Sequence, residues 1–522
     1  MKFLSRKTNT VEKSAIVIGV FTLIGSVLSV LRNSLLASYL GASKDIDIYY
    51  ASFRIPDFIF NIFIMGAITA GLIPLFSKYL NTKKEEANDF INSTILGIAF
   101  FSVAFGVILL IFANPIVDFL FKGLPVDSRI MVATMTRIII LQPVILGISS
   151  ILGNMLLVFD MVVPFALAPL FYNLGIIFGL VFLYPQMGLI GLAYGVVIGA
   201  ILNLMIKILP AKAAGFQWKI VKFSLFKKHM YEFGSLIVPR TLSVINIQLF
   251  AFVVTFFATF LPSGRLGIFN LANSLQEFPQ TVFSSAIAIA AFPVLAKLFH
   301  QNKIDDLKKA YLKGFFQIVF VMTLVSSGLF VLKFALVKLL LNYGNFDIAS
   351  TAMTANVLNI MAVGLVFTSL LLMNLDTLFA MGDVYTPLIA SFVAYSLGAG
   401  LIYFWYQKFD IFGITLALVL ANFVYLIIMM IKILLKLKIG WWYVAKRFLL
   451  NLMIGVSSAI IGMIVLNSMD GFKYANRAYY MLFNLILPGF VIVLAYILLA
   501  KIFKIGEMND FWNIIIKRFK KI

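Results

Sequence analysis

The sequence predicts an all-α integral membrane protein with fourteen transmembrane helices, and three observations support this class. The chain has 522 residues, of which 62% are hydrophobic and only 12% are charged, a balance typical of membrane proteins and not of soluble domains of this length. The hydrophobic residues form runs of about 20, the length at which a helix crosses a bilayer. Short segments of the first half also return, in the same order, in the second half.

The predicted spans follow one another through short polar connections. They lie near residues 14–40, 50–79, 88–113, 131–158, 162–183, 188–210, 232–262, 266–298, 314–340, 351–380, 384–406, 411–435, 445–468 and 478–503. The first span follows the basic segment MKFLSRKTNTVEK and lacks a small-residue cleavage site, so we expect an uncleaved span and not a signal peptide. The longest connection is the basic segment around 211–231, and none is long enough to hold a soluble domain.

The basic residues predict the orientation. The formal net charge is +21, which in a soluble chain would suggest a nucleic-acid partner. Here the Lys and Arg residues lie between apolar runs, so we expect a bilayer and no nucleic acid. Placing both termini in the cytoplasm puts most of the 42 Lys and Arg residues on that side, as the positive-inside rule requires. Cysteine is absent, which excludes disulfides and thiolate metal sites.

Four pairs of similar segments indicate an internal repeat. LLASYL (35–40) is similar to FFATFL (256–261), IPLFSKYL (73–80) to FPVLAKLF (292–299), VFDMVVP (158–164) to LFAMGDVYTP (378–387), and LMIKIL (204–209) to MMIKIL (429–434). We therefore expect two six-span lobes, 1–212 and 213–440, followed by two further spans in 441–504 and a basic cytoplasmic tail, 505–522. Parallel repeats are typical of transporters, which place the substrate site between the halves and work by alternating access.

The second predicted span contains charged residues and a helix breaker. Arg54, Asp57 and Asn61 are spaced i, i+3 and i+7, so they share one face of a helix. Pro56 removes a backbone hydrogen bond and kinks the span beside them. A charge at mid-membrane costs about 2.5–3.5 kcal/mol. Two interpretations stay open: a cavity wall in which Arg54 meets an anionic substrate and Asp57 orients it, or a self-neutralising pair that braces the bundle.

Three other charged residues lie near the ends of spans. Arg32 lies towards the outer end of the first span, where it either contributes to a substrate site or extends to the interface. Asp47 begins the second span, where a carboxylate suits a helix N-terminus. Arg240 follows Pro239 near the inner end of the seventh span, and extension to the interface is the simpler account there.

The eighth span repeats the polar break of the second. In LANSLQEFPQ, the side chains of Asn273, Ser274 and Glu277 precede Pro279, at the position that matches Arg54 and Asp57 in the repeat. A two-lobed substrate site predicts such a pair of breaks.

The tenth span holds Asn374, Asp376 and Thr377. No cation lies near Asp376 in the sequence, so its carboxyl group is protonated, paired across helices or coordinating an ion; a Na⁺ or H⁺ coupling site is one hypothesis. We expect no other cofactor. An enzyme is disfavoured, because the chain has two histidines, no paired carboxylates in a loop and no glycine motif that would cradle phosphate.

The segment LSVLRNSLLASYLGASKDIDIYYASFRIPDFIFNIFIMGAITAGLIPLFSKYL resembles the N-terminal signature of the MurJ (MviN) family of lipid II flippases, in the MOP exporter superfamily. Further similar segments are TRIIILQP (136–143), APLFYNLGIIFG (168–179), VPRTLSVINIQL (238–249), EFPQ (277–280), YGNF (343–346) and GDVYTP (382–387). The resemblance covers roughly residues 15–440, and the last two spans match by number only.

The resemblance implies a V-shaped MOP- and MATE-like fold in the bacterial inner membrane. It implies transport of an undecaprenyl-pyrophosphate-linked peptidoglycan precursor, lipid II, from the inner to the outer leaflet. In that family the central cavity is cationic and spans thirteen and fourteen form a groove for the lipid tail. Arg32, Asp47 and Arg54 match charged residues of the family by position.

The sequence departs from the family pattern at several arginines. An arginine pair and a glutamate of the family stand as Phe60, Asn61 and Met65 here, and two further arginines stand as Ser26 and Ser274. The cavity is therefore less basic than the family pattern. One hypothesis is a divergent lipid II flippase that uses Arg32, Arg54 and Arg240. The alternatives are a flippase for another polyprenyl-linked oligosaccharide and a cation-coupled, MATE-like exporter of small amphipathic molecules.

Overall fold

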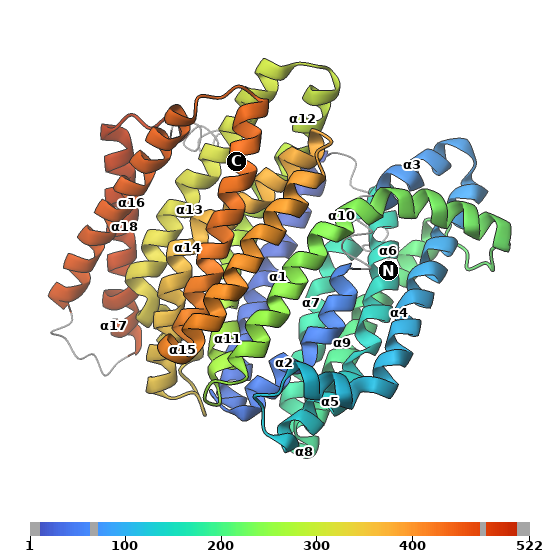
Figure 1. The fold of residues 1–522 in the computed structure, drawn as a ribbon, viewed down its shortest axis with the longest axis horizontal. Coiled ribbons are helices and arrows are strands. Elements are labelled where there is room, and N and C mark those ends of the chain that lie inside the picture. The colour runs from blue at the N-terminus through green and yellow to red at the C-terminus, as the bar shows by residue number, and fades with distance from the viewer. Residues whose placement is uncertain (1–10, 63–70, 470–476, 509–522) are drawn as a thin grey trace. The chain divides into compact units, whose positions relative to one another are not determined.

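The computed structural model describes residues 11–62, 71–469 and 477–508. Every regular element in these ranges is a helix (Figure 1). The chain divides into two compact units, Met1–Gly267 and Ile268–Ile522.

The first unit contains ten complete α-helices and the π-helical segment η3 among its described residues, and residues 61–62 and 71–72 are π-helical as well. The complete elements are α1 (Val11–Leu40), α2 (Lys44–Phe60), α3 (Ile73–Thr82), α4 (Lys84–Leu120), α5 (Val126–Ile139), α6 (Leu141–Val158), α7 (Val162–Phe178), η3 (Gly179–Leu183), α8 (Tyr184–Met187), α9 (Leu189–Ala213) and α10 (Phe223–Ala258). The unit thus includes α10, the first span of the predicted second lobe, because contacts and not the repeat define its limits.

The second unit begins within α11 (Arg265–Pro279). The elements that follow are η4 (Gln280–Ser285), α12 (Ala286–His300), α13 (Ile304–Leu341), α14 (Ile348–Ala380), α15 (Tyr385–Lys436), α16 (Trp441–Met469), α17 (Arg477–Met481), η5 (Leu482–Ile486) and α18 (Leu487–Ile502).

The helices agree with the predicted spans. In the described ranges, eleven helical segments are long and apolar enough to cross a membrane. Helix α15 holds two predicted spans, separated by Asp410 at a φ of 55°, and α10 contributes the shorter apolar segment Val244–Ala258. The second predicted span includes most of α2, which is described, and residues 63–70, which are not among the described residues. Together these segments are consistent with the predicted fourteen spans.

Close packing of glycines joins α7 to α9. A Cβ added to Gly175 would lie 2.2 Å from the Cα of Gly199, and one added to Gly195 would lie 2.5 Å from the Cα of Gly179. Glycines four residues apart let two membrane helices approach until their backbones touch. The two helices are therefore held in one register, and α7 carries residues of the candidate site.

The two appended spans attach to α13 within the second unit. Tyr496 of α18 donates a 2.8 Å hydrogen bond to the carbonyl of Phe320. On α16, Gly455 accepts a 2.9 Å hydrogen bond from Ser327, and a Cβ there would lie 2.3 Å from the side chain of Thr323. Buried polar bonds of this kind fix the position of both spans on α13.

The internal repeat also appears in the turns that end matching helices. In the first half, Asp160 has a φ of 58°, and the N–H of the next residue, Met161, donates to the carbonyl of Leu156. In the second half, Gly382 has a φ of 72° and Asp383 N donates to the carbonyl of Leu378 in the same way. This six-to-one bond around a left-handed residue is a Schellman turn.

Candidate functional site

The proline of the second predicted span lies close to a change in helix type. Pro56 lies inside α2, which ends at Phe60, and residues 61–62 are π-helical. In the matching place Pro279 ends α11 and the π-helical segment η4 follows. Single π-helical turns are frequent at functional sites. In both halves, therefore, π-helical residues follow the proline of the polar break.

A polar cluster lies within the first unit, on α1, α2 and α7. Arg32 Nη1 donates to Asn173 Oδ1 at 2.9 Å, and its Nε and Nη2 donate to Asn33 Oδ1 at 3.2 and 3.0 Å. Asn173 in turn donates from Nδ2 to the carbonyl of Pro169 at 3.0 Å, which orients its oxygen towards the arginine. Both asparagines are buried. The guanidinium of Arg32 is thus held in place by neutral acceptors.

Asp57 interacts electrostatically with Arg54 most strongly and then with Arg32. All three side chains are partly buried. The cluster therefore holds two guanidinium groups and one carboxylate. The charges of Arg54 and Asp57 cancel, and the positive charge of Arg32 is left over. Tyr49 and Tyr172 also interact with Arg32.

Asp47 has a role that its position in the sequence did not indicate. Its side chain is 4% exposed and accepts hydrogen bonds from the backbone N–H groups of Gly264 at 2.6 Å and Gly267 at 2.8 Å. Gly264 has a φ of 88°, and a Cβ there would lie 2.2 Å from the carbonyl oxygen of Ala42. The carboxylate therefore stabilises the start of α11 and not only its own helix, as carboxylates do at helix N-termini.

Two other predicted residues of the first unit add less to the cluster. Asn61 caps α2 through its backbone N–H, and its side chain is partly buried. Arg240 lies on α10, but its side chain lies outside the described residues.

The predicted polar residues of α11 bond mainly within their own helix. Asn273 Nδ2 donates to Glu277 Oε1 at 2.7 Å, and Ser274 donates to the carbonyl of Leu271 at 2.8 Å. Gln276 ties this helix to α14, because it donates to the carbonyl of Met361 at 3.1 Å. Gln276 is buried, and the sequence analysis missed it.

The three predicted residues of α14 differ in their surroundings. Asn374 is fully buried, and its Oδ1 accepts a 2.9 Å hydrogen bond from Tyr311. Its Nδ2 has no hydrogen-bond partner in the described part of the chain. Thr377 is also fully buried and donates to the carbonyl of Met373 at 2.6 Å. Asp376 is partly buried. Among the described residues, no three His, Cys, Asp or Glu side chains gather as a metal site.

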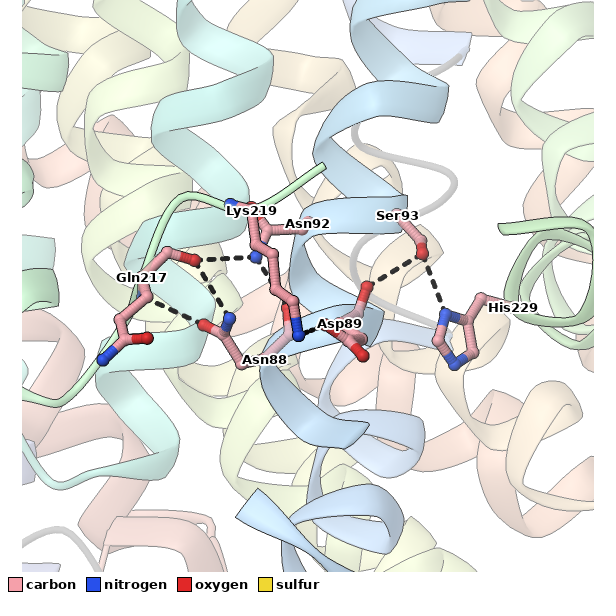
Figure 2. A network of polar contacts seen from close by, with 7 residues as sticks. All are labelled: Asn88, Asp89, Asn92, Ser93, Gln217, Lys219 and His229. Atoms are coloured by element: carbon pink, nitrogen blue, oxygen red, sulfur yellow. Dashed lines mark hydrogen bonds and ion pairs between the residues drawn. The ribbon is translucent and has the colours of Figure 1, made fainter. Parts of the chain in front are cut away.

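A second polar network, at the start of α4, holds the segment that joins α9 to α10. Figure 2 shows Asn88 and Asn92 of α4 facing the backbone of this segment. Both amide nitrogens donate to the carbonyl of Gln217 at 2.9 Å. In return Gln217 N donates to Asn88 at 3.0 Å and Lys219 N to Asn92 at 3.2 Å. We call residues 217–219 with these two asparagines the linker clip.

A buried histidine continues this network onto α10 (Figure 2). Ser93 donates its hydroxyl hydrogen to the backbone carbonyl of Asp89 at 2.8 Å. The same hydroxyl lies 2.8 Å from His229 Nδ1, so the imidazole N–H is the donor of that second bond. Burial lowers the pKa of His229 from its ordinary value, and the positive charge of Lys228 lowers it further. The imidazole is therefore held in its neutral form.

Arg32, Arg54 and Asp57 were predictable from the sequence, whereas Asn173 and the linker clip were not predicted. Asn173 lies in the segment APLFYNLGIIFG, where a tyrosine and an asparagine interrupt an otherwise apolar span. Such an intramembrane polar pair is the signal that would have found it.

The described ranges include eleven helical segments long and apolar enough to cross a membrane, with charged side chains among them, and this defines a multi-span integral membrane protein. A solved multidrug resistance MATE family transporter of the MOP superfamily, in an inward-facing conformation, covers 81% of this chain and 98% of its own, with a TM-score of 0.66 at 17% identity. A structure described as lipid II flippase MurJ, inward closed conformation, covers 94% and 98%, with a TM-score of 0.77 at 20% identity.

The sequence comparison is more specific than the fold. The family model described as lipid II flippase MurJ matches residues 36–489, and the chain belongs to this family. A probable lipid II flippase MurJ of Buchnera aphidicola subsp. Acyrthosiphon pisum (strain APS) is 28% identical over 423 residues, 79% of this chain and 81% of the relative. The predicted fold class, the family resemblance and the expectation of a transporter instead of an enzyme are confirmed.

Proposed function

We propose that this protein is a lipid II flippase, which moves the undecaprenyl-pyrophosphate-linked peptidoglycan precursor from the inner to the outer leaflet. The observation that carries the proposal is the match of the MurJ family model over residues 36–489. The polar cluster of the first unit supports it, because a pyrophosphate headgroup needs cationic groups that are partly shielded from water.

In this proposal Arg32 and Arg54 bind the headgroup. Guanidinium groups bind phosphate oxygens through two parallel hydrogen bonds. Arg32 is oriented by Asn173 and Asn33, so little side-chain entropy is lost when it binds. Asp57 orients Arg54 through their electrostatic interaction. The excess of one positive charge favours the substrate site over a purely structural pair.

The remaining candidates keep their places in the proposal. Asn61, Arg240, Asn273, Ser274 and Glu277 are assigned to the polar lining that contacts the sugar–peptide headgroup, and Asp47 to positioning α11. The family arginines replaced by Phe60 and Ser274 make the site less basic. The arginines that remain, Arg32 and Arg54, still suit an anionic headgroup better than a small amphipathic cation, so another polyprenyl-linked oligosaccharide is the second candidate.

We propose further that the protein lies in the inner membrane with both termini in the cytoplasm, as the positive-inside distribution of its Lys and Arg residues indicates. The lobes 1–212 and 213–440 follow the repeat.

Coupling to Na⁺ or H⁺ is assigned to Asn374, Asp376 and Thr377, since a carboxyl group inside a membrane helix is the usual site of such coupling. Flipping measured in vesicles with and without a Na⁺ or a pH gradient tests this assignment.

Complementation of a conditional lipid II flippase depletion strain tests the main proposal. Growth and outer-leaflet exposure of lipid II are scored for the wild type, Arg32→Ala, Arg54→Ala and the matched control Arg129→Ala. Arg129 belongs to the same unit but pairs with Asp118 at 2.9 Å, away from the cluster. We expect rescue by the wild type and the control, and loss of rescue by the other two variants at equal membrane levels.

The possible results distinguish an error in the assigned binding residues from an error in the assigned substrate. Rescue by Arg32→Ala and Arg54→Ala together with the wild type refutes the site assignment. If the wild type inserts normally but does not rescue growth, the cargo is a different polyprenyl-linked glycan.

A further inference from the structure

A basic cavity lies in the second unit, where the turn after α14 meets the last turns of α15. It has a volume of about 600 Å³. Its lining consists of Gly382, Asp383, Tyr385, Lys432, Leu435 and Lys436. None of these residues belongs to the candidate substrate site. In the proposed orientation, on which this inference rests, the cavity faces the cytoplasm.

The matching corner of the first unit is filled. There the Schellman turn at Asp160 meets the end of α9, where Gly215 has a φ of 93°. Phe159 and Phe216, together with side chains of α3 and α4, line a cavity of only about 20 Å³ there. The helix ends have the same hydrogen-bond pattern in both corners. The two corners therefore share the bonds of their turns and differ in what surrounds them.

The two lysines of the cavity are available to an anion. Lys432 is exposed and makes no hydrogen bond or ion pair to the described residues. Lys436 donates to the carbonyl of Met381 at 3.1 Å and lies 5.5 Å from the ring of Phe299. An ammonium group has three donors, so one bond to a carbonyl holds Lys436 in place and leaves donors for a ligand.

The acidic residue of the lining, Asp383, is bonded to the start of α15. Asp383 Oδ1 accepts from Thr386 N at 3.0 Å, and Oδ2 accepts from Thr386 Oγ1 at 2.9 Å. Both oxygens are thus engaged at the start of α15. Lys308 and Lys438 lie together at this end of the unit, where Lys308 donates to the carbonyl of Lys438 at 3.3 Å, so the surroundings are positive.

Apolar side chains beside the cavity indicate that its ligand is a lipid. Tyr385 is 73% exposed and Leu435 is 72% exposed. Ile389 and Ile431 are exposed one helical turn further into the membrane. Acyl chains cover such surfaces in a bilayer, and a phosphate group at the interface would lie beside the lysines.

We propose that this cavity binds the headgroup of an anionic phospholipid of the inner leaflet, with Lys432 and Lys436 contacting the phosphate. The acyl chains lie along Ile389 and Ile431. Lys432 has only the role of binding the ligand, whereas Lys436 also bonds to the end of α14. Lys432 is therefore the residue to substitute.

Native mass spectrometry of the full chain in detergent tests this site, with phosphatidylglycerol as the probe. A lysine at a membrane surface contributes about 1 kcal/mol, equal to about fivefold in affinity. We expect Lys432→Gln to bind phosphatidylglycerol about fivefold more weakly than the wild type and Lys432→Arg to bind it equally well. The matched control is Lys408→Gln, an exposed lysine near the kink of α15, and it should bind as the wild type does.

Three results would overturn the proposal. One is equal binding by Lys432→Gln and the wild type, and another is an equal loss by Lys408→Gln, which would indicate a general effect of charge. The third is displacement of phosphatidylglycerol by millimolar inorganic phosphate, which would indicate a soluble ligand. Because binding is measured directly, failure here is independent of whether the protein transports lipid II.

Discussion

Removing the carboxylate of Asp47 is expected to destabilise the first unit strongly. The side chain is 4% exposed and bonds to two backbone N–H groups, of Gly264 and Gly267. A hydrogen bond to a charged group contributes about 1.5–3 kcal/mol, and the loss of a buried partner leaves the donor unsatisfied. Asp47→Ala breaks both bonds, so we expect a loss of about 3 kcal/mol or more. Asp47→Asn keeps one acceptor oxygen, so we expect about half that loss.

Thermal unfolding of the detergent-purified protein measures this effect. For a unit of this size, 1 kcal/mol corresponds to about 2 °C in Tm, so Asp47→Ala should lower Tm by about 6 °C and Asp47→Asn by about 3 °C. Asp45→Ala is the matched control, since Asp45 lies in the same first turn of α2 and should contribute about 0.3–1 kcal/mol through the helix dipole alone.

The comparison of Asp47→Ala with Asp45→Ala tests whether the bonds of Asp47 to the start of α11 stabilise the protein. If Asp47→Ala lowers Tm no more than Asp45→Ala does, the bonds to the start of α11 do not stabilise the protein, and the role assigned to Asp47 is wrong.

Two further predictions concern the first unit. Gly195→Val should separate α7 from α9, because its Cβ would lie 2.5 Å from Gly179; we expect a loss of about 1–3 kcal/mol, measured as a lower Tm, whereas Gly19→Val, with open space around it, should leave Tm unchanged. The lowered pKa of His229 means that the unfolded state binds its proton first as the pH falls below about 6.5. Stability should therefore decline below that pH and return as the pH rises through it. His229→Gln should flatten this dependence in thermal unfolding between pH 7.5 and 5.5, and an unchanged slope would refute it.

The spans and the repeat were predictable from the sequence because both are local patterns. A run of about 20 apolar residues is one helix whatever lies beside it, and the pairing of Pro56 with Pro279 needs only an alignment of the chain with itself. The charges at Arg32, Arg54 and Asp57 were conspicuous because so few charges occur inside spans.

The partners of these charges were not predictable, because they are distant in the sequence. Asn173 lies 141 residues from Arg32, and the two donors to Asp47 lie 217 and 220 residues beyond it. Helical periodicity indicates which face of a span is polar, but it does not indicate which other span that face meets.

The cavity at Lys432 was missed for a different reason. The segments LMIKIL and MMIKIL look alike in the sequence, yet Lys207 is buried and donates to Ser149 at 2.9 Å, whereas Lys432 is exposed at the cavity. Two lysines in the same motif thus have opposite surroundings, and only the packing around each helix end distinguishes them.

The bonds of Asp47 also have a consequence for the order in which the protein is made. A chain emerges from the ribosome with its N-terminus first, and units form as they are completed. The carboxylate is synthesised early, but its two donors are among the last residues of the first unit, which ends at Gly267. The linker clip and His229 have all their partners before that point. The first unit can therefore assemble in the membrane while the second is still being translated, and formation of the Asp47 bonds marks its completion.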